Sequence, residues 1–116
     1  MEIRIISDTI SVDELKEVAR EFYRYMIKGV VDIEREVIAM GGEYHIDAST
    51  VLNQVGHRQE NIWGFNINLD EEKDSVNWIE YVSLINIRPA QGNRSMQIED
   101  EQIKSKIKEI LLKKIS

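Results

Sequence analysis

The sequence contains no cysteine and only one proline among its 116 residues. The absence of cysteine excludes disulfide scaffolds, thiolate metal sites and cysteine nucleophiles, so the burial of apolar side chains must supply most of the stability. Basic residues are also few, with 15 against 21 acidic ones and a net charge of -6. Non-specific wrapping of nucleic acid requires clustered lysine and arginine, so this balance argues against nucleic acid as a partner and leaves only a local basic patch open.

Long apolar runs are missing as well. The first residues, MEIRIISDTIS, include two acidic side chains and no uninterrupted apolar stretch, so we expect neither a signal peptide nor a membrane span, and we expect a cytoplasmic protein. Apolar residues make up 42% of the chain and charged residues 31%, which is typical of a folded protein. This length and composition predict a single domain over residues 1–116, with no cofactor.

The first half of the chain carries a helical pattern. Residues 3–6 are short and β-branched and predict a strand. Ser11 and Glu14 then form the signature of a capping box, which marks the start of a helix. Apolar residues follow at the spacing of one buried helical stripe, and Gly41-Gly42 provide a stop. We therefore predict one helix of about thirty residues, with this stripe: Leu15, Val18, Phe22, Met26, Val30, Ile33 and Val37.

The second half alternates with a period of two. Residues 43–52 and 63–69 each place apolar side chains on one face, which predicts two half-buried strands joined by a hairpin turn at 56–59. Residues 78–88 predict a third strand, and acidic residues from Glu99 open a C-terminal helix. The predicted class is α+β in the order β-α-β-β-β-α, with a mainly antiparallel sheet, a long N-terminal helix and the C-terminal helix packed on the sheet.

One candidate site is the polar face of the predicted hairpin. Glu43, His45 and Asp47 would project from one side of a strand, and an imidazole flanked by carboxylates suits a general base or a divalent cation. His45 and Asp47 are therefore our candidate catalytic residues. The alternative is an ordinary solvated sheet face. We predict no metal site built from His45, Asp47 and His57, because an extended chain would hold His57 far from His45.

The second candidate site is the loop Arg88-Pro89-Ala90-Gln91-Gly92-Asn93-Arg94-Ser95. It combines two guanidinium groups, two amides and a glycine just before a helix, which suits a phosphate or a carboxylate. The candidate ligand-binding residues are Arg88, Gln91, Asn93 and Arg94, with Gln59 from the predicted turn nearby. The alternative is a structural loop, whose arginines pair with the following acidic residues and whose amides satisfy backbone groups.

Three short segments carry a family resemblance: Gly41-Gly42-Glu43, Trp63-Gly64-Phe65-Asn66 and Ile87 to Ser95. Over nearly its full length the chain resembles a family of short, uncharacterised microbial proteins. That resemblance implies no activity and no catalytic residue.

The sequence itself names no reaction, and whether the protein is an enzyme stays open. Our first hypothesis is a domain that binds or processes a small anionic ligand through the Arg88–Ser95 loop. The second is a non-catalytic interaction module or homodimer, because a long helix and at least one open sheet edge favour association. A third and weaker hypothesis is binding of RNA or a nucleotide through the same loop.

Overall fold

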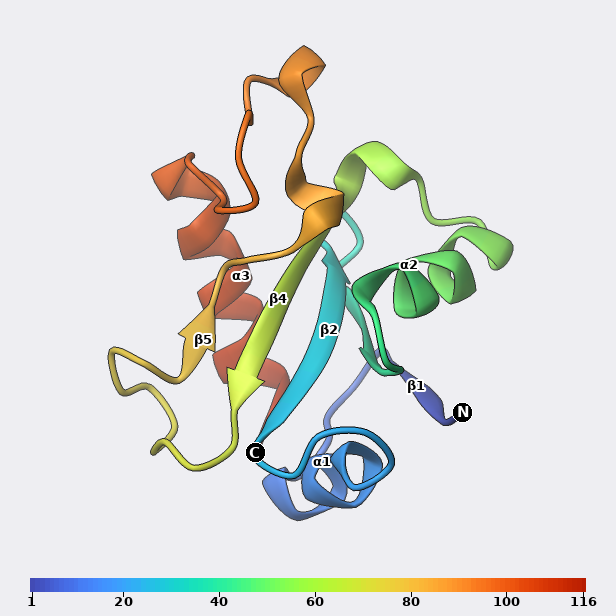
Figure 1. The fold of residues 1–116 in the computed structure, drawn as a ribbon, viewed down its shortest axis with the longest axis vertical. Helices are drawn as coiled ribbons and strands as arrows, with labels where there is room; N and C mark the ends of the chain where they lie inside the picture. The colour runs from blue at the N-terminus through green and yellow to red at the C-terminus, as the bar shows by residue number, and fades with distance from the viewer.

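The structure, a computed structural model, describes residues 1–116. It contains three α-helices and five strands (Figure 1). In chain order these are β1 (Ile3–Ile6), α1 (Val12–Ala19), β2 (Met26–Asp32), β3 (Val37–Gly41), α2 (His45–Gln54), β4 (Ile62–Asn68), β5 (Ile79–Glu80) and α3 (Glu101–Lys114). Short 3-10 turns lie at Gln59–Asn61, Leu84–Asn86 and Pro89–Gln91. None of the helices has the length and apolar character needed to cross a membrane.

The strands form one antiparallel sheet in the order β1-β3-β2-β4-β5. The predicted α+β class and antiparallel sheet are confirmed, as are the strand at residues 3–6, the strand of β4 and the C-terminal helix. The capping box is also present, because the Ser11 hydroxyl accepts a hydrogen bond from the Glu14 N–H at 3.1 Å. These are the elements whose signals are local in the sequence.

The predicted thirty-residue helix is wrong. Helix α1 ends at Ala19, and the following residues form the hairpin of β2 and β3. The physical reason is that β2 is buried on both faces: Val30 packs in one apolar cluster and its neighbour Val31 in another. An amphipathic helix can bury only one stripe, whereas an inner strand covered on both sides buries consecutive residues.

A side chain at the end of β2 makes the turn between these two strands. The Asp32 Oδ1 atom accepts hydrogen bonds from the backbone N–H groups of Glu34 and Arg35, at 2.9 and 3.0 Å. Glu36 then adopts a left-handed conformation with φ of 56°. Aspartate commonly nucleates turns through such bonds to the backbone. The hairpin therefore has a local cause in Asp32, although the apolar spacing of this segment predicts a helix.

The predicted strand at 43–52 is also wrong, because these residues form α2. Its buried members are His45, Ala48, Ser49 and Leu52, which recur at helical spacing, whereas Tyr44 and Ile46 are exposed. The predicted hairpin between this segment and β4 is therefore absent, and β4 pairs with β2 instead, with Val30 opposite Gly64. The observed order is β-α-β-β-α-β-β-α.

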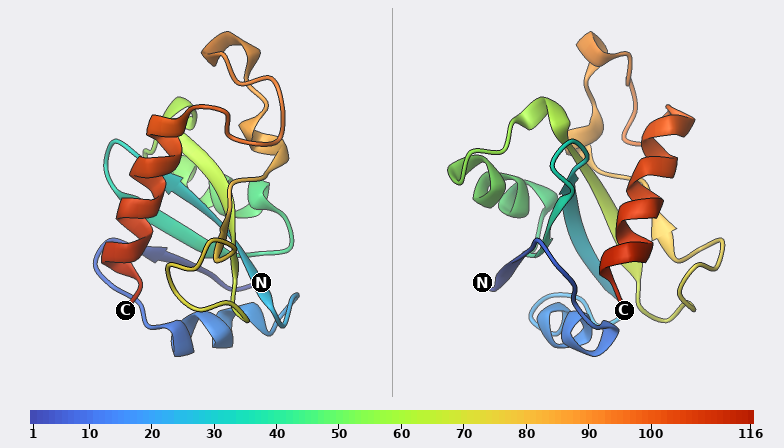
Figure 2. Two further views of the ribbon diagram at one scale, coloured as in Figure 1. Left: turned by 90° about the vertical axis from the view of Figure 1, so that its left-hand side faces the viewer. Right: turned by 180° about the vertical axis from the view of Figure 1, so that it is seen from behind.

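The predicted strand at 78–88 survives only as the two residues of β5. Beyond it a side chain replaces the strand, because the buried Asn86 amide accepts from the Gly64 N–H at 2.8 Å and donates to the Gly64 carbonyl at 3.0 Å. These two bonds mimic the pairing that a neighbouring backbone would make. Residues 82–97 can therefore leave the sheet and form an irregular segment beside β4, part of which extends past the end of the sheet (Figure 2).

Helices lie on both faces of the sheet. Figures 1 and 2 show α3 and α2 on opposite sides of β2 and β4, with α1 across one end. The larger apolar cluster, of 20 residues, includes Trp63, Phe65 and Ile107 and lies on the α3 face. The α2 face carries a smaller cluster of five residues: Val30, Ala39, Ala48, Leu52 and Ile62. This difference leaves room on the α2 face for a cavity.

Candidate functional site

A cavity of about 470 Å³ lies on the α2 face of the sheet. Its floor comes from β2 and β4, one wall from the first turn of α2, and the other wall from residues 82–85. Most of the lining is apolar, with a few polar groups, as in typical small-molecule sites, and its volume falls in their usual range. The lining residues are Met26, Lys28, Tyr44, His45, Ile46, Asn66, Val82, Ser83, Leu84, Ile85 and Met96.

His45 is the central polar residue of the cavity. Its ring is buried, and Nε2 lies 2.9 Å from the Phe65 carbonyl oxygen and 2.8 Å from Asn66 Oδ1. Burial is the main cause that lowers the pKa of His45, and the charge of Lys28 adds to it, while the bonds to Phe65 and Asn66 act in the opposite direction. The cavity therefore holds a neutral imidazole near pH 7.

Lys28 brings a positive charge to the same cavity. The Nζ atom lies over the rings of Tyr23 and Tyr44, at 5.2 and 5.5 Å from their centroids. No carboxylate lies within ion-pair distance of this ammonium. Aromatic faces attract a cation without neutralising it, so the Lys28 charge remains available to an anion.

Asp47 does not join His45 in a dyad. Both residues lie in the first turn of α2, and the Asp47 Oδ2 atom accepts hydrogen bonds from the backbone N–H groups of Glu43 and Tyr44, at 3.1 and 2.9 Å. A carboxylate at this position stabilises the start of a helix. The side chain of Asp47 thus holds the turn that places His45 in the cavity.

Arg88 is held by backbone carbonyls. Its guanidinium donates hydrogen bonds to the carbonyl oxygens of Ile85 at 3.1 Å, Glu60 at 3.3 Å and Ile62. It also stacks on Trp63, with Cζ 4.4 Å from the ring centroid, and burial lowers its pKa. These contacts attach the loop to the start of β4.

The amides of the predicted ligand-binding set are likewise bonded within the protein. Gln91 donates to the Glu60 carbonyl at 3.0 Å, and the buried Asn93 donates to the carbonyl of Asn86 at 2.8 Å. Gln59 Oε1 accepts from the Ser49 hydroxyl at 2.8 Å. Arg94 differs, because its exposed guanidinium makes no bond to the protein and only its backbone N–H binds Glu99. The structure therefore brings Arg88, Gln91 and Asn93 together as a folded loop, on which Arg94 alone is free.

The carboxylate partner of a histidine occurs elsewhere in the molecule. His57 Nδ1 lies 2.7 Å from Asp32 Oδ2, and both side chains are buried. Because Asp32 also accepts two N–H groups of the β2–β3 turn, this pair joins that turn to the chain that follows α2. No sequence motif links two residues so far apart, so the pair was not predictable.

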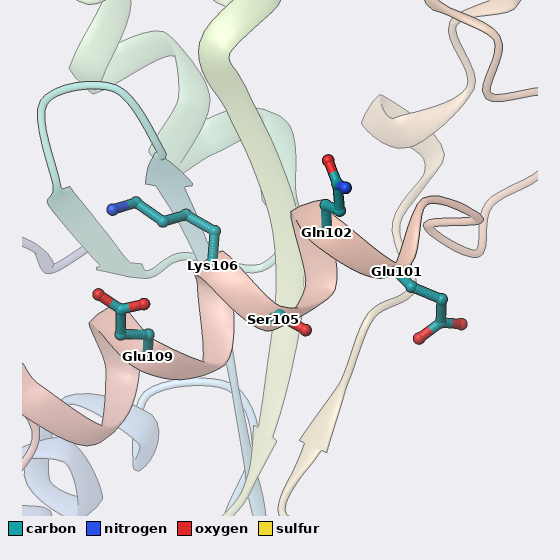
Figure 3. A pocket seen from close by; sticks show the side chains of 5 residues that line it. All are labelled: Glu101, Gln102, Ser105, Lys106 and Glu109. Atoms are coloured by element: carbon teal, nitrogen blue, oxygen red, sulfur yellow. The ribbon is translucent and has the colours of Figure 1, made fainter.

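Another group of polar side chains lines a shallow hollow along α3 (Figure 3). Figure 3 shows that its members, which all come from this one helix, point in different directions: Glu101, Gln102, Ser105, Lys106 and Glu109. Lys106 reaches across to Glu36, 3.2 Å away. No apolar residue lines this hollow, so it offers little surface to a ligand compared with the His45 cavity.

Sequence reasoning found His45 but missed Lys28 and the wall at residues 82–85. Lys28 lies outside the apolar stripe of the predicted thirty-residue helix, so that helix gives it no place at a buried site. The signal that could have found it is the alternation Met26, Lys28, Val30, which places all three on one face of a strand.

Comparison with known proteins completes the description of the chain. The model of the family described as "Protein of unknown function (DUF5674)" matches residues 4–114. No curated protein and no solved structure matches the chain. The match covers almost the whole sequence and confirms the resemblance to a family without assigned function. The chain belongs to the family of proteins of unknown function DUF5674.

Proposed function

We propose that this protein binds a small, mainly apolar molecule with one anionic group in the His45 cavity. The observation that carries the proposal is the ammonium of Lys28, which lies at an apolar cavity without a carboxylate partner. A carboxylate or sulfonate there would gain a charge-assisted hydrogen bond, while its hydrocarbon part would bury apolar surface against Met26, Val82 and Ile85. A compact phosphate would use only the charge and leave the apolar walls unfilled.

The test compares ligands that differ in only one of these properties. Octanoate has both the anionic group and the apolar chain, octanol has only the chain, and inorganic phosphate has only the charge. We expect octanoate to raise the melting temperature and to shift the NMR signals of Asn66 and Ser83, with much weaker effects from the other two. Equal effects of octanoate and octanol would refute a role for charge, and no effect of either would refute the site.

Two lysine variants test whether the positive charge that binds octanoate is that of Lys28. Lys28→Met should weaken octanoate binding by about tenfold to a hundredfold, the value of a hydrogen bond to a charged group. Lys108→Met is the matched control, because Lys108 lies on α3, across the sheet, in an exposed ion pair with Asp74. Such pairs contribute little to stability, so this variant should bind octanoate as the wild type does.

The Arg88–Ser95 loop is a second candidate site, for a small anion such as phosphate. The exposed guanidinium of Arg94 favours this site, whereas the guanidinium of Arg88 is already bonded to carbonyl groups. If the loop binds phosphate, Arg94→Ala should abolish stabilisation by phosphate while octanoate still binds. Stabilisation by phosphate that persists in Arg94→Ala would exclude the loop.

A non-catalytic interaction module is the alternative function. The supporting observation is the exposure of apolar side chains around the cavity mouth, with Leu84 70%, Tyr44 59% and Ile46 52% exposed. Contiguous exposed apolar surface is typical of association sites. Size-exclusion chromatography with light scattering should then show a homo-oligomer that Leu84→Ser dissociates. A monomer at high concentration would exclude the homodimer.

A further inference from the structure

Two acceptors determine the tautomer of the neutral His45 ring. The Phe65 carbonyl can only accept a hydrogen bond, so the Nε2 atom, 2.9 Å away, must carry a proton and donate it. The Asn66 Oδ1 atom, 2.8 Å from Nε2, is a second acceptor. In the neutral ring the lone pair is therefore on Nδ1, and any additional proton must bind there.

The Nδ1 atom is left open by the protein. It makes no hydrogen bond with any protein group, and it is not among the buried atoms that lack a partner. Since His45 as a whole is only 9% exposed and lines the cavity, we infer that the accessible nitrogen is reached through the cavity. A bound molecule can therefore meet Nδ1 directly.

The charges around His45 oppose its protonation in the free protein. Burial is the main cause that lowers the pKa of His45, and the positive charge of Lys28 on β2 lowers it further. From α2, the carboxylate of Asp47 is used on backbone N–H groups, while Glu43 acts on the Tyr44 hydroxyl and raises the pKa of Tyr44. From β5, Glu80 lies opposite Asn66 in the sheet and is exposed. None of these carboxylates contributes to the shift at His45.

An anion in the cavity would reverse this balance, because it would supply the negative charge that the surroundings of His45 lack. We propose that ligand binding is coupled to proton uptake: the anionic group lies between the Lys28 ammonium and Nδ1 of His45, and His45 takes a proton from solvent as the ligand binds. This inference rests on the proposed function of the cavity. It adds that the ligand's affinity increases as the pH falls.

The test uses a probe that stays ionised at every pH examined. We choose 1-octanesulfonate, because octanoate would itself take up protons at the acidic end. Titration calorimetry at pH 7.2 in imidazole and in Tris buffer should give different heats, since the proton comes from buffers with different ionisation enthalpies. Between pH 8 and pH 5.5 the affinity should rise by up to tenfold per pH unit, the limit for uptake of one proton.

The histidine signals provide a direct readout, because the chain has only two histidines. Adding octanesulfonate should raise the titration midpoint of the His45 ring proton signal. His57, held by Asp32 at 2.7 Å outside the cavity, is the internal control and should not move. His45→Gln should bind octanesulfonate with equal heats in both buffers and with no dependence on pH in this range.

The possible failures are distinguishable. If wild type binds octanesulfonate with equal heats and pH-independent affinity, proton coupling is refuted while the proposed function stands. A pH dependence that persists in His45→Gln would also refute it, because another group would then be responsible. If wild type binds neither octanesulfonate nor octanoate, the proposed function fails and this inference fails with it. Measurements on the wild type decide the matter even if the variant does not fold.

Discussion

Replacement of Asn86 by alanine would test how much the side chain that pairs with the backbone of β4 contributes to stability. The Asn86 amide is fully buried and makes bonds of 2.8 Å with the Gly64 N–H, 3.0 Å with the Gly64 carbonyl and 3.2 Å with the Met96 carbonyl. Alanine would leave two buried backbone groups of Gly64 unpaired, each at a cost of about 1–3 kcal/mol. We expect a loss of about 2–6 kcal/mol, which is a large part of the about 5–15 kcal/mol that stabilises a typical domain.

Urea denaturation followed by far-UV circular dichroism measures this loss. With a slope of about 2 kcal/mol/M, the midpoint should fall by at least about 1 M. Asn77→Ala is the matched control, because Asn77 is exposed and its side chain makes no hydrogen bond, and it should change stability by less than about 0.5 kcal/mol. A loss below about 1 kcal/mol in Asn86→Ala, with an unchanged slope, would show that the edge of β4 does not depend on this amide.

Three further predictions concern other buried contacts. Gly64→Ala would place a Cβ atom 2.5 Å from Ser83 Cβ, so it should lower the free energy of unfolding by about 1–3 kcal/mol; adding Ser83→Gly should restore part of this, and additive losses in the urea midpoint would contradict the clash. His57→Ala would leave the buried Asp32 carboxylate without its 2.7 Å partner and should cost about 3–5 kcal/mol. Adding Asp32→Asn should reduce that cost in a double-mutant cycle, and its failure to do so would argue against a charge effect. Folding lowers the pKa of His45, so as the pH falls the unfolded chain takes up a proton at a higher pH than the folded chain does. The free energy of unfolding should therefore be greatest above about pH 6.5 and should decrease as the pH falls toward the lower pKa of the folded state. Melting temperatures from pH 8 to pH 5 should show this decrease, with a smaller slope for His45→Gln; equal slopes would assign the effect to other groups.

Elements with local signals were predictable from the sequence. The capping box at Ser11 and Glu14 marks the start of α1. The alternation in β4 and the acidic start of α3 identify those elements as well, and Asp100 caps α3 by accepting from the Gln102 N–H at 2.8 Å. Each signal depends on residues within one or two turns of the chain, so it does not require knowledge of the neighbours in space.

The candidate site was only partly predictable. His45 was chosen as a strand residue beside Asp47, but its chemistry comes from Phe65 and Asn66, about twenty residues away in the chain. The predicted helix leaves Lys28 outside its apolar stripe, because helix and strand periodicities overlap in a segment where both faces are apolar. The carbonyl groups that accept hydrogen bonds from Arg88 were not predictable either, because the pattern of side chains along the sequence does not show which backbone atoms lie nearby in space.

The sequence by itself determined three boundaries: the cap at Ser11, the break at Gly41-Gly42 and the start of α3. It also determined the class, because enough apolar residues alternate with polar ones to build a sheet with helices on it. Only the tertiary structure decided that residues 26–41 form a hairpin, since α3 and α2 bury both faces of β2. The same packing leaves Lys28 and His45 together at one cavity, because α2 covers only part of its face of the sheet.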